Sequence, residues 1–460
     1  MEVVALIPGL LAVWMTLRRS PQAAFLGVYL PSLVMLPDYY YWNAPGLPDP
    51  SFVKSAILPV AVGFFVRSAS KWRWSFTDLL VLGFAAAVGT SEYRAAGYKE
   101  AQNLLFDCVT GVVFPYMLAK ALIEPNGLRV QTAKRLVVLF FAVSCISLFE
   151  FRFGKNPWQM LLGRFFPYQG LGWVVTIRWG FGRIAAPYGH AILAGVMMVV
   201  GFRLARWLEW TGAWPKKIRR LPWQPLETGR MLSLGVLAGL LMTLCRGPWL
   251  GGVAAALVCA IGRSKNRKRA VGIVLAVVLG VGIPVFAAFK TYVAVGREGA
   301  ESATQETAAY RFELLHNYLD IVNQKPLLGW GRNTWPKVPG QPSIDNHYLL
   351  LLLMHGWLAV GCFLGLLVHV GGRLFLHGIR EPANGPPGSS FAITMAGILL
   401  AIYFAIATVF LGLNTQPMLF LLLGWSEGYL LFGTRRPSLA TARVTAAIQP
   451  QPSVQFARVL

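Results

Sequence analysis

Long apolar runs, separated by short polar stretches, recur along almost the whole chain. They are about 15–22 residues long and lack the apolar/polar alternation of membrane β-strands. Because roughly 20 apolar residues suffice to cross the hydrocarbon core as a helix, they predict membrane helices. We expect about thirteen spans, at residues 2–17, 23–37, 52–66, 77–91, 102–122, 135–150, 188–206, 230–245, 248–262, 270–289, 346–371, 391–411 and 416–433. The predicted fold class is an all-α polytopic membrane protein with 12 or 13 transmembrane helices.

One long polar stretch interrupts this pattern. We therefore divide the chain into transmembrane helices at 1–289, a loop at 290–345, about three more spans at 346–433 and a disordered cytoplasmic tail at 434–460. Within the loop, residues 305–323 predict an amphipathic helix that can lie in the membrane interface. Its apolar positions are Phe312, Leu315, Leu319 and Val322. Lys325-Pro326 should end it, and a turn should follow at Gly329-Trp330-Gly331.

The composition is that of a membrane protein, and its charge favours anionic lipids over nucleic acid as partners. Of the 460 residues, 55% are hydrophobic and 13% charged, about half the charged fraction of a soluble domain. The net charge of +23 comes from Lys and Arg beside the spans, which is typical of cytoplasmic loops and contact with anionic lipids rather than of a nucleic-acid interface. The five cysteines lie in or beside apolar runs without metal-ligand spacing. No leading stretch resembles a removable signal peptide.

The positions of the basic clusters give an orientation. Alternate loops carry most of the Lys and Arg, with the strongest cluster at 263–269, and the positive-inside rule assigns them to the cytoplasm. The remaining loops are then extracytoplasmic, at 38–51, 92–101, 151–187, 246–247, 290–345 and 412–415. Because the 263–269 cluster lies one span before it, the 290–345 loop is predicted to be outside whatever the total number of spans.

Four arginines on the outer side run against this charge bias. Arg178 and Arg183 precede a span, Arg246 lies in a tight turn between two spans, and Arg311 lies in the large loop. Arginines near helix ends can simply extend to the lipid headgroups. Several of them beside Gly-rich turns at one membrane face favour an anionic ligand, because guanidinium groups pair bidentately with phosphate. We expect a membrane-bound, phosphate-bearing substrate.

Short motifs around these arginines occur in a fixed order over residues 178–361. They are Arg178 through Arg183 with Pro187, Gly189 and His190; Thr243-Leu244-Cys245-Arg246-Gly247; Arg311 followed by Pro326, Gly329 and Gly331; and Asp345-Asn346-His347-Tyr348-Leu349 with Gly356 and Gly361. Together they resemble the bacterial O-antigen ligase / O-antigen polymerase family of integral-membrane glycosyltransferases. Two positions depart from that family: Cys245 replaces a usual Ser, and Asp345 stands where many members have His.

The resemblance implies a reaction at the outer face of the bacterial cytoplasmic (inner) membrane. The donor would be a glycan on undecaprenyl pyrophosphate, and the acceptor a hydroxyl of another saccharide or of lipid A–core. Arg183, Arg246 and Arg311 would stabilise the departing pyrophosphate, with Arg178, His190, Asn346 and Tyr348 in supporting positions. The resemblance also implies no cofactor and a metal-independent reaction, in which arginines replace a divalent ion.

The base that activates the acceptor hydroxyl is either His347 or Asp345. A neutral imidazole suits proton removal near pH 7, which favours His347. Asp345 could serve instead, or could cap the following helix. On a helix start the two side chains point about 200° apart, so only one of them should face the substrate.

A different class of function is also open from the sequence. The acidic residues Asp107 and Glu427 lie within apolar runs, where an unpaired charge is costly. We expect each of the two acids to have a partner. Acidic residues within membrane spans are also compatible with a transporter or flippase of lipid-linked or anionic polysaccharide precursors. The sequence shows no halved repeat of the kind common in transporters, and its polar features gather at one face.

Overall fold

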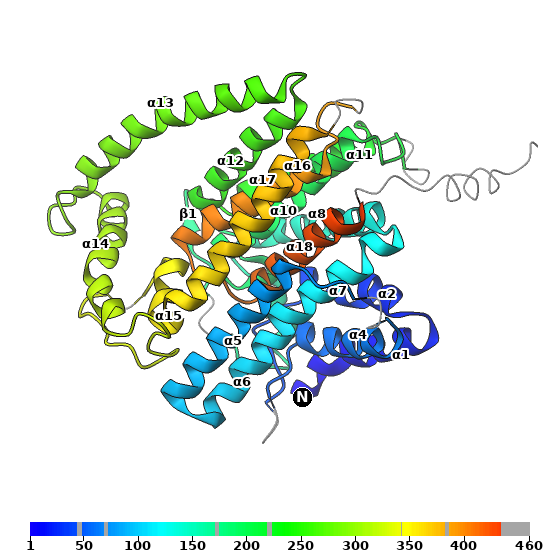
Figure 1. Ribbon diagram of the computed structural model, residues 1–460, viewed down its shortest axis with the longest axis horizontal. Helices are drawn as coiled ribbons and strands as arrows, with labels where there is room; N and C mark the ends of the chain where they lie inside the picture. Colours follow the sequence, from blue (N-terminus) through cyan, green and yellow to red (C-terminus); the bar gives the residue numbers. More distant parts are fainter. Residues whose placement is uncertain are drawn as a thin grey trace, which may run out of the picture.

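The computed structural model describes residues 1–43, 48–68, 72–170, 174–218, 223–341, 343–381 and 386–433; the tail expected at 434–460 lies outside these ranges. The described chain is almost entirely helical (Figure 1). Its helices are α1 (Ile7–Arg18), α2 (Pro21–Ala24), α3 (Leu30–Met35), α4 (Phe52–Ser68), α5 (Phe76–Ala96), α6 (Tyr98–Cys108), α7 (Phe114–Leu122), α8 (Arg129–Phe153), α9 (Pro157–Leu162), α10 (Ala191–Trp210), α11 (Thr228–Met242), α12 (Arg246–Arg263), α13 (Arg267–Val293), α14 (Ala303–Gln324), α15 (His347–Leu366), α16 (Gly372–Arg380), α17 (Phe391–Ala405) and α18 (Thr415–Gly428). The strands are β1 (Ile177–Arg178) and β2 (Phe181–Gly182).

These helices confirm the predicted all-α polytopic membrane fold; the expected number of 12 or 13 spans stays a prediction. Among the described residues, six helical segments are long and apolar enough to cross a membrane: Ala101–Asn126, Arg129–Phe153, Ala191–Trp210, Arg267–Val293, His347–Arg380 and Phe391–Thr408. The shorter apolar helices Pro21–Met35 and Thr228–Met242 add to them. Each remaining expected span also coincides with a helix, at α1, α4, α5, α12 and α18. The chain is an all-α, multi-pass membrane protein.

The centre of the bundle is formed by α10, α17 and α18, which are buried along most of their length. Glycines let neighbouring helices approach closely there. A Cβ on Gly251 of α12 would lie 2.8 Å from the carbonyl oxygen of Ala401 on α17, and a Cβ on Gly424 of α18 would meet the backbone of Tyr116 on α7. Small residues at helix contacts are the usual way in which membrane helices pack tightly.

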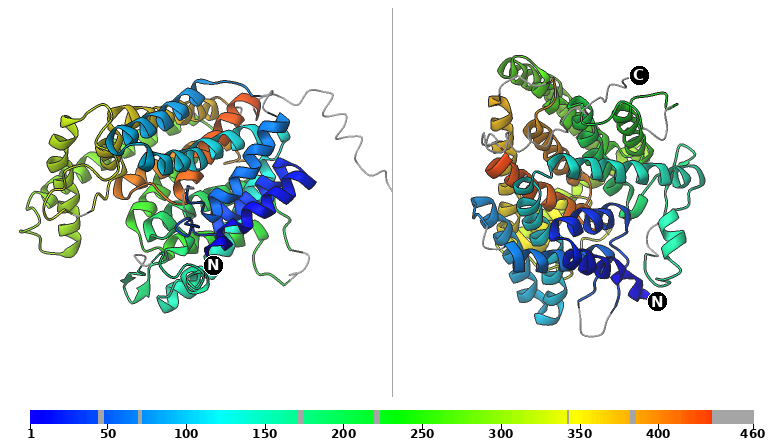
Figure 2. Two further views of the ribbon diagram at one scale, coloured as in Figure 1. Left: turned by 90° about the horizontal axis from the view of Figure 1, so that it is seen from below. Right: turned by 90° about the vertical axis from the view of Figure 1, so that its right-hand side faces the viewer.

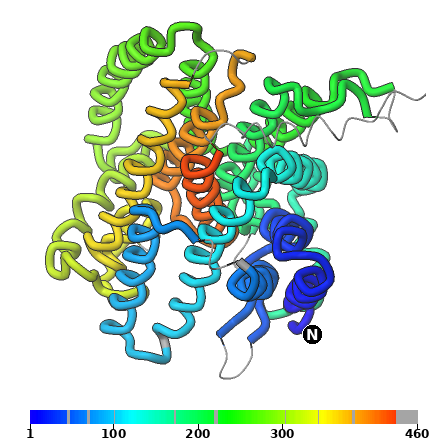
Figure 3. The backbone as a smooth tube through the Cα atoms, turned by 45° about the vertical axis from the view of Figure 1, so that its right-hand side comes forward, coloured from blue at the N-terminus to red at the C-terminus, as the bar shows by residue number. Residues whose placement is uncertain are grey.

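Helices α13 and α14 lie on the opposite side of the bundle from the N-terminal helices α1–α4 (Figure 2). Of α13, only Val293 is buried, so this long apolar helix stands apart from the core. The chain then passes through α14 and returns into α15 along the same side (Figure 3). Helix α14 covers the expected 305–323 segment and ends before Lys325. Its Leu314, Tyr318 and Val322 are buried.

The expected apolar face of α14 is therefore only partly the face that packs inward. Val322 is buried at 1% exposure, whereas Phe312, Leu315 and Leu319 keep 41–47% exposure. Residues at positions 314, 318, 321 and 322 form a second apolar stripe, and this one contacts the protein. Phe312, Leu315 and Leu319 form the exposed stripe on another side of the helix.

The Pro326–Gly331 segment docks onto a break in α15. Gly356 has a φ of +68° and interrupts the helix. The freed N–H of Trp357 donates to the Pro326 carbonyl at 2.7 Å, while the N–H of Gly331 donates to the Met354 carbonyl at 2.8 Å. A Cβ on Gly329 would lie 2.6 Å from Met354. Gly329 and Gly331 of the third motif and Gly356 of the fourth thus allow the Pro326–Gly331 part of the large loop to dock onto α15.

Candidate active site

Arg178 and Arg183 are carried by a two-stranded antiparallel hairpin that the hydropathy pattern did not predict. Its two turn residues, Trp179 and Gly180, have φ values of 53° and 79°, as in a type I′ turn. Arg178 is the last residue of β1, and Arg183 directly follows β2. The N–H of Arg183 donates to the Thr176 carbonyl at 2.9 Å, which continues the hairpin ladder. A single short turn thereby brings both arginines together.

A buried carboxylate fixes the segment that follows the hairpin. Glu150 of α8 is completely buried and accepts hydrogen bonds from the N–H groups of Ala185 and Ala186, both at 2.9 Å. The side chain of Asn156 donates to the same carboxylate at 3.0 Å. His190 then caps α10, its Nδ1 accepting the Ile192 N–H at 3.2 Å. Glu150 was not among the predicted site residues, although an acidic residue inside an apolar helical run is a signal for it.

The turn between α11 and α12 holds the two hairpin arginines. Nη1 of Arg178 donates to the Leu244 carbonyl at 2.7 Å. Nη2 of Arg183 donates to Sγ of Cys245 at 2.8 Å, and its Nε donates to the Thr243 carbonyl at 3.4 Å. The φ of Leu244, +50°, turns the chain sharply enough to present these acceptors. The first and second motifs therefore form one unit.

Arg246 adds a third cation to this unit. It is the first residue of α12, directly after the turn. The pKa of Arg178 is lowered from its ordinary value, first by burial and then by the positive charges of Arg183 and Arg246. Three guanidinium groups are therefore close enough to repel one another.

Arg311 reaches the same region from α14. Its Nη2 donates to the Thr408 carbonyl at 3.5 Å. A Cβ on Gly247, the residue after Arg246, would lie 2.7 Å from the Thr408 hydroxyl. Thr408 thus separates the start of α12 from the tip of Arg311. The Nε of Arg311 is buried and has no hydrogen-bond partner among the described residues.

Asp345 is tied to α14 through two hydrogen bonds. The Ser343 hydroxyl donates to Asp345 Oδ1 at 2.6 Å, and the Tyr310 hydroxyl donates to the Ser343 carbonyl at 2.6 Å. Tyr310 immediately precedes Arg311 in the chain. The Tyr310–Ser343 contact therefore joins α14 to the segment that carries the half-buried Asp345. Tyr310 and Ser343 were not anticipated, because neither belongs to a recognisable motif.

The residues after Asp345 turn inward. Asn346, not Asp345, caps α15: its side-chain oxygen accepts from the N–H groups of Tyr348 and Leu349, at 3.0 and 3.2 Å. His347 is buried, and its Nδ1 accepts the Leu411 N–H at 3.1 Å. The Tyr348 hydroxyl donates to the Tyr403 carbonyl at 2.6 Å. The structure therefore places Asn346, His347 and Tyr348 in structural contacts.

Electrostatic effects link His190 with both sides of the site. The pKa of His190 is lowered from its ordinary value, mainly by burial and then by Arg183, while the carboxylate of Asp345 acts in the opposite direction. Arg183 from the hairpin and Asp345 from the large loop thus both lie within range of His190. The hairpin and the large loop, which are far apart in the sequence, therefore both contribute a charge near His190.

The four arginines share an unusual feature. In the part of the chain that the structure describes, no ion pair joins Arg178, Arg183, Arg246 or Arg311 to a carboxylate. Clustered like charges that lack counter-charges are electrostatically unfavourable, so they favour an anion between them. The arrangement can bind a doubly charged group such as pyrophosphate.

The intramembrane acids, by contrast, have local partners. Asp107 accepts from Lys54 Nζ at 2.6 Å, and Glu427 accepts from Arg373 Nη1 at 2.8 Å. The pairing expected for both acids is therefore present. Among the described residues, neither acid shares a hydrogen bond or ion pair with Arg178, Arg183, Arg246 or Arg311.

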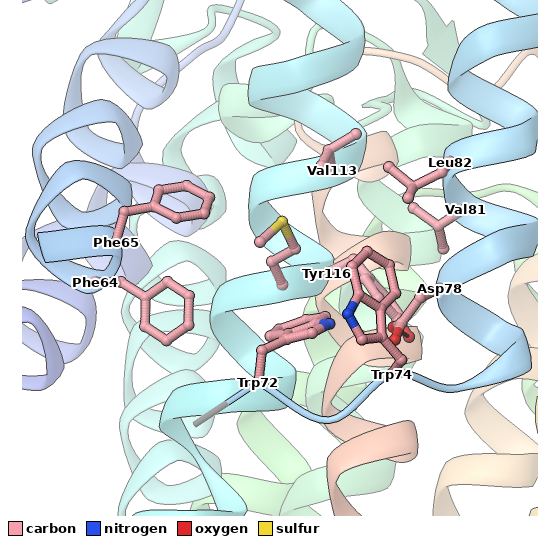
Figure 4. Close-up of a pocket in the computed structure, with 10 residues that line it drawn as sticks. Phe64, Phe65, Trp72, Trp74, Asp78, Val81, Leu82, Val113 and Tyr116 are labelled. Carbon is pink, nitrogen blue, oxygen red and sulfur yellow. Dashed lines mark hydrogen bonds between the residues drawn. The ribbon is translucent and has the colours of Figure 1, made fainter. Parts of the chain in front are cut away.

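A separate apolar pocket lies between α4, α5 and α7 (Figure 4). It has a volume of about 320 Å³ and is walled by aromatic side chains such as Phe64, Trp72 and Trp74. Asp78 at its base is engaged by Lys120, at 2.6 Å, and by the Tyr116 hydroxyl, also at 2.6 Å. Among the described residues that line this pocket, Asp78 is the one acid, and it is ion-paired with Lys120.

Residues 231–364 match the family model described as O-antigen ligase. No curated protein matches the chain. The matched stretch contains Arg246, Arg311 and Asp345, while the hairpin and His190 precede it. Together with the multi-pass helical fold, this match supports the resemblance of the chain to the O-antigen ligase/polymerase family of glycosyltransferase-type membrane enzymes.

Proposed function

We propose that the protein transfers or polymerises glycan from an undecaprenyl-pyrophosphate donor at the outer face of the bacterial cytoplasmic membrane. One observation carries the proposal: four arginines without carboxylate partners among the described residues converge with one carboxylate, that of Asp345. An anionic leaving group and a proton-accepting group are the two requirements of the reaction. The positive-inside pattern supports an outward-facing site.

The arginines bind the pyrophosphate and stabilise it as it leaves. Arg178 and Arg183 approach it from the hairpin, Arg246 from the start of α12 and Arg311 from α14. Negative charge builds up on the pyrophosphate oxygen as the glycosidic bond breaks, and fixed guanidinium groups stabilise that charge without reorganisation. This supports a reaction in which no divalent ion is needed, as the family resemblance implies.

Asp345 is the base in this proposal, in place of His347, which the sequence favoured. Nδ1 of His347 already accepts the Leu411 N–H, and its ring packs edge-on against Phe363 at 5.4 Å. Asp345 is half-buried and keeps a second carboxylate oxygen that has no hydrogen bond among the described residues. It takes the proton of the acceptor hydroxyl, whose oxygen attacks the anomeric carbon as undecaprenyl pyrophosphate departs.

Release of undecaprenyl pyrophosphate from a lipid-linked oligosaccharide tests the proposal directly. Purified protein should release it only when an acceptor is present. Two acceptors, a second lipid-linked repeat unit and lipid A–core, distinguish a polymerase from a ligase.

Arg311→Ala should lower the rate about 10²–10³-fold. Arg164, exposed on the 151–187 segment, offers the matched control as Arg164→Ala. Wild-type turnover by a folded Arg311→Ala protein would contradict the pyrophosphate role.

A transporter or flippase remains the alternative from the sequence, but its main support is weakened. Asp107 and Glu427 each have a local basic partner, so neither is an unpaired group that a proton-coupled path would use. Movement of a labelled lipid-linked saccharide across proteoliposomes, without cleavage of its pyrophosphate bond, would favour transport instead.

A further inference from the structure

A second cavity adjoins the candidate active site on its loop side. It has a volume of about 240 Å³ and lies between α14, residues 335–341 and 343–344, and the stretch after α17. Its walls include Tyr318, Trp335 and Phe410, and its polar groups include Lys337, Gln341 and Ser343. Concave sites with mainly apolar walls and a few placed polar groups are the usual form of small-molecule sites.

Gln341 gives this cavity an unused hydrogen-bond acceptor. The residue is only 4% exposed, and its side-chain Oε1 has no partner among the described residues. Its backbone is engaged, since the Tyr318 hydroxyl donates to its carbonyl at 3.4 Å and its own N–H donates to the Val338 carbonyl at 3.1 Å. A buried acceptor that is left unpaired is unfavourable, so a ligand hydroxyl that donates to Oε1 would remove the penalty.

The other side chains of the cavity fit a saccharide. A pyranose ring has an apolar face of C–H groups and a rim of hydroxyls. The half-buried ring of Trp335 can take the apolar face, and the exposed ammonium of Lys337 can donate to a ring substituent. A lipid chain would leave the buried Oε1 of Gln341 unpaired, so a carbohydrate suits the cavity better than an acyl group does.

Ser343 connects the cavity to Asp345. It lines the cavity, and its hydroxyl donates to Asp345 Oδ1 at 2.6 Å. A sugar bound here would therefore lie next to the residue that holds the proposed base, Asp345. We propose that this cavity is the subsite for the acceptor saccharide, with Trp335 as its stacking platform and Gln341 as its hydroxyl acceptor; the assignment to the acceptor rests on the proposed function.

Saturation-transfer NMR with a panel of methyl pyranosides tests the subsite without any turnover. The panel contains the glucoside, galactoside, mannoside and N-acetylglucosaminide, added to the full chain in detergent. We expect at least one to bind.

Trp335→Ala should weaken the binding of that glycoside about tenfold, and Gln341→Leu, which keeps the size of the side chain, about three- to tenfold. Trp223, which is 77% exposed and remote in the α10–α11 loop, supplies the control Trp223→Ala. Absence of binding by the wild-type protein, or equal binding by all four proteins, would overturn the subsite.

Kinetics with a lipid-linked donor then show whether the cavity binds the acceptor or the donor. Both cavity variants should raise the KM for the acceptor while leaving the KM for the donor unchanged. A raised donor KM with an unchanged acceptor KM would overturn the acceptor assignment. If the glycosides bind in a Trp335-dependent way but no acceptor ever supports pyrophosphate release, the subsite stands and the proposed function fails.

Discussion

Nη2 of Arg183 lies 2.8 Å from Sγ of Cys245, and the same thiol donates to the Thr243 carbonyl at 3.0 Å. The thiol therefore accepts from a cation on one side and donates to the backbone on the other. The pKa of Cys245 is raised by burial, although Arg183 opposes that rise, so the group stays protonated and able to donate. One side chain thereby fixes the orientation of an arginine that is 62 positions away in sequence.

Replacement of this thiol tests whether its hydrogen bond positions Arg183 or whether the side chain only fills space. Cys245→Ser keeps a group that both donates and accepts, so kcat/KM should stay within about threefold of the wild type. Cys245→Ala removes the acceptor for Nη2 of Arg183, while Nε keeps the Thr243 carbonyl, and should lower kcat/KM about five- to tenfold. The measurement is the rate of undecaprenyl pyrophosphate release, with thermal unfolding as the check on folding. Equal rates for the Ala and wild-type proteins would show that Arg183 does not need this contact.

Arg246 provides a test of guanidinium geometry as distinct from charge. Arg246→Ala should lower kcat about 10²–10³-fold because it removes one donor to the leaving group. Arg246→Lys keeps the charge but loses the planar pair of donors, so its rate should fall between those of the wild-type and Ala proteins. If Lys and Ala are equally slow, geometry matters more than charge. If both match the wild type, Arg246 does not contact the pyrophosphate.

The identity of the base can be decided with two substitutions. Asp345→Asn removes the proton-accepting carboxylate, and we expect a loss of about 10²–10⁴-fold in kcat. His347→Gln keeps an acceptor for the Leu411 N–H and should retain most of the activity. Single-turnover rates on a preformed donor complex measure the chemical step. A fully active Asp345→Asn protein beside an inactive but folded His347→Gln protein would reverse the assignment.

The predictable part of the site came from residues whose chemistry does not depend on neighbours. Four arginines on one predicted membrane face predict an anionic substrate, because a guanidinium stays charged in any surroundings. The helix cap was harder, since Asp345 and Asn346 are adjacent and both residue types cap well. Only the backbone direction decides between them. The role of His347 depends on Leu411, a contact across 64 positions that no local pattern reveals.

In the fold, too, local features could be predicted from the sequence and long-range contacts could not. Hydropathy predicted the helices, because burial in lipid demands long apolar runs. It could not reveal that the loop around Gly329 docks onto α15 at Gly356, since this requires two distant backbones to meet. It also gave an incomplete account of α14, whose two apolar stripes look alike in sequence, although only the one containing Leu314 and Tyr318 contacts the core.

His190 should make stability depend on pH. Burial and Arg183 lower its pKa in the folded protein, although Asp345 partly opposes them. In the unfolded chain it titrates near its ordinary value of 6.5. The unfolded state therefore binds more protons as pH falls below about 6.5, and the contribution of this group to stability, complete above that pH, is progressively lost.

The matched variant for this effect is His190→Asn, which retains an acceptor at the cap of α10. Thermal unfolding in detergent at pH 7.5 and 5.5 should show a larger fall in Tm for the wild-type protein than for the variant. Identical falls would mean that His190 titrates alike in both states.

Gly356 offers the sharpest test of the docked loop. Its φ of +68° is strained for any residue with a Cβ, and a Cβ there would lie 2.4 Å from the Leu327 backbone. Gly356→Ala should therefore cost at least about 1–2 kcal/mol in backbone strain and push the Pro326–Gly331 segment away from α15. Gly361 of the same helix serves as the control, because a Cβ added there would meet no atom of the described residues within 4 Å. We expect Gly356→Ala to lower Tm and expose the loop to limited proteolysis, and Gly361→Ala to leave both unchanged or slightly improved, since Ala favours helix. Because the docked segment joins α14 to Asp345, Gly356→Ala should also slow pyrophosphate release; a stable, protease-resistant and fully active variant would show that the loop does not depend on this break.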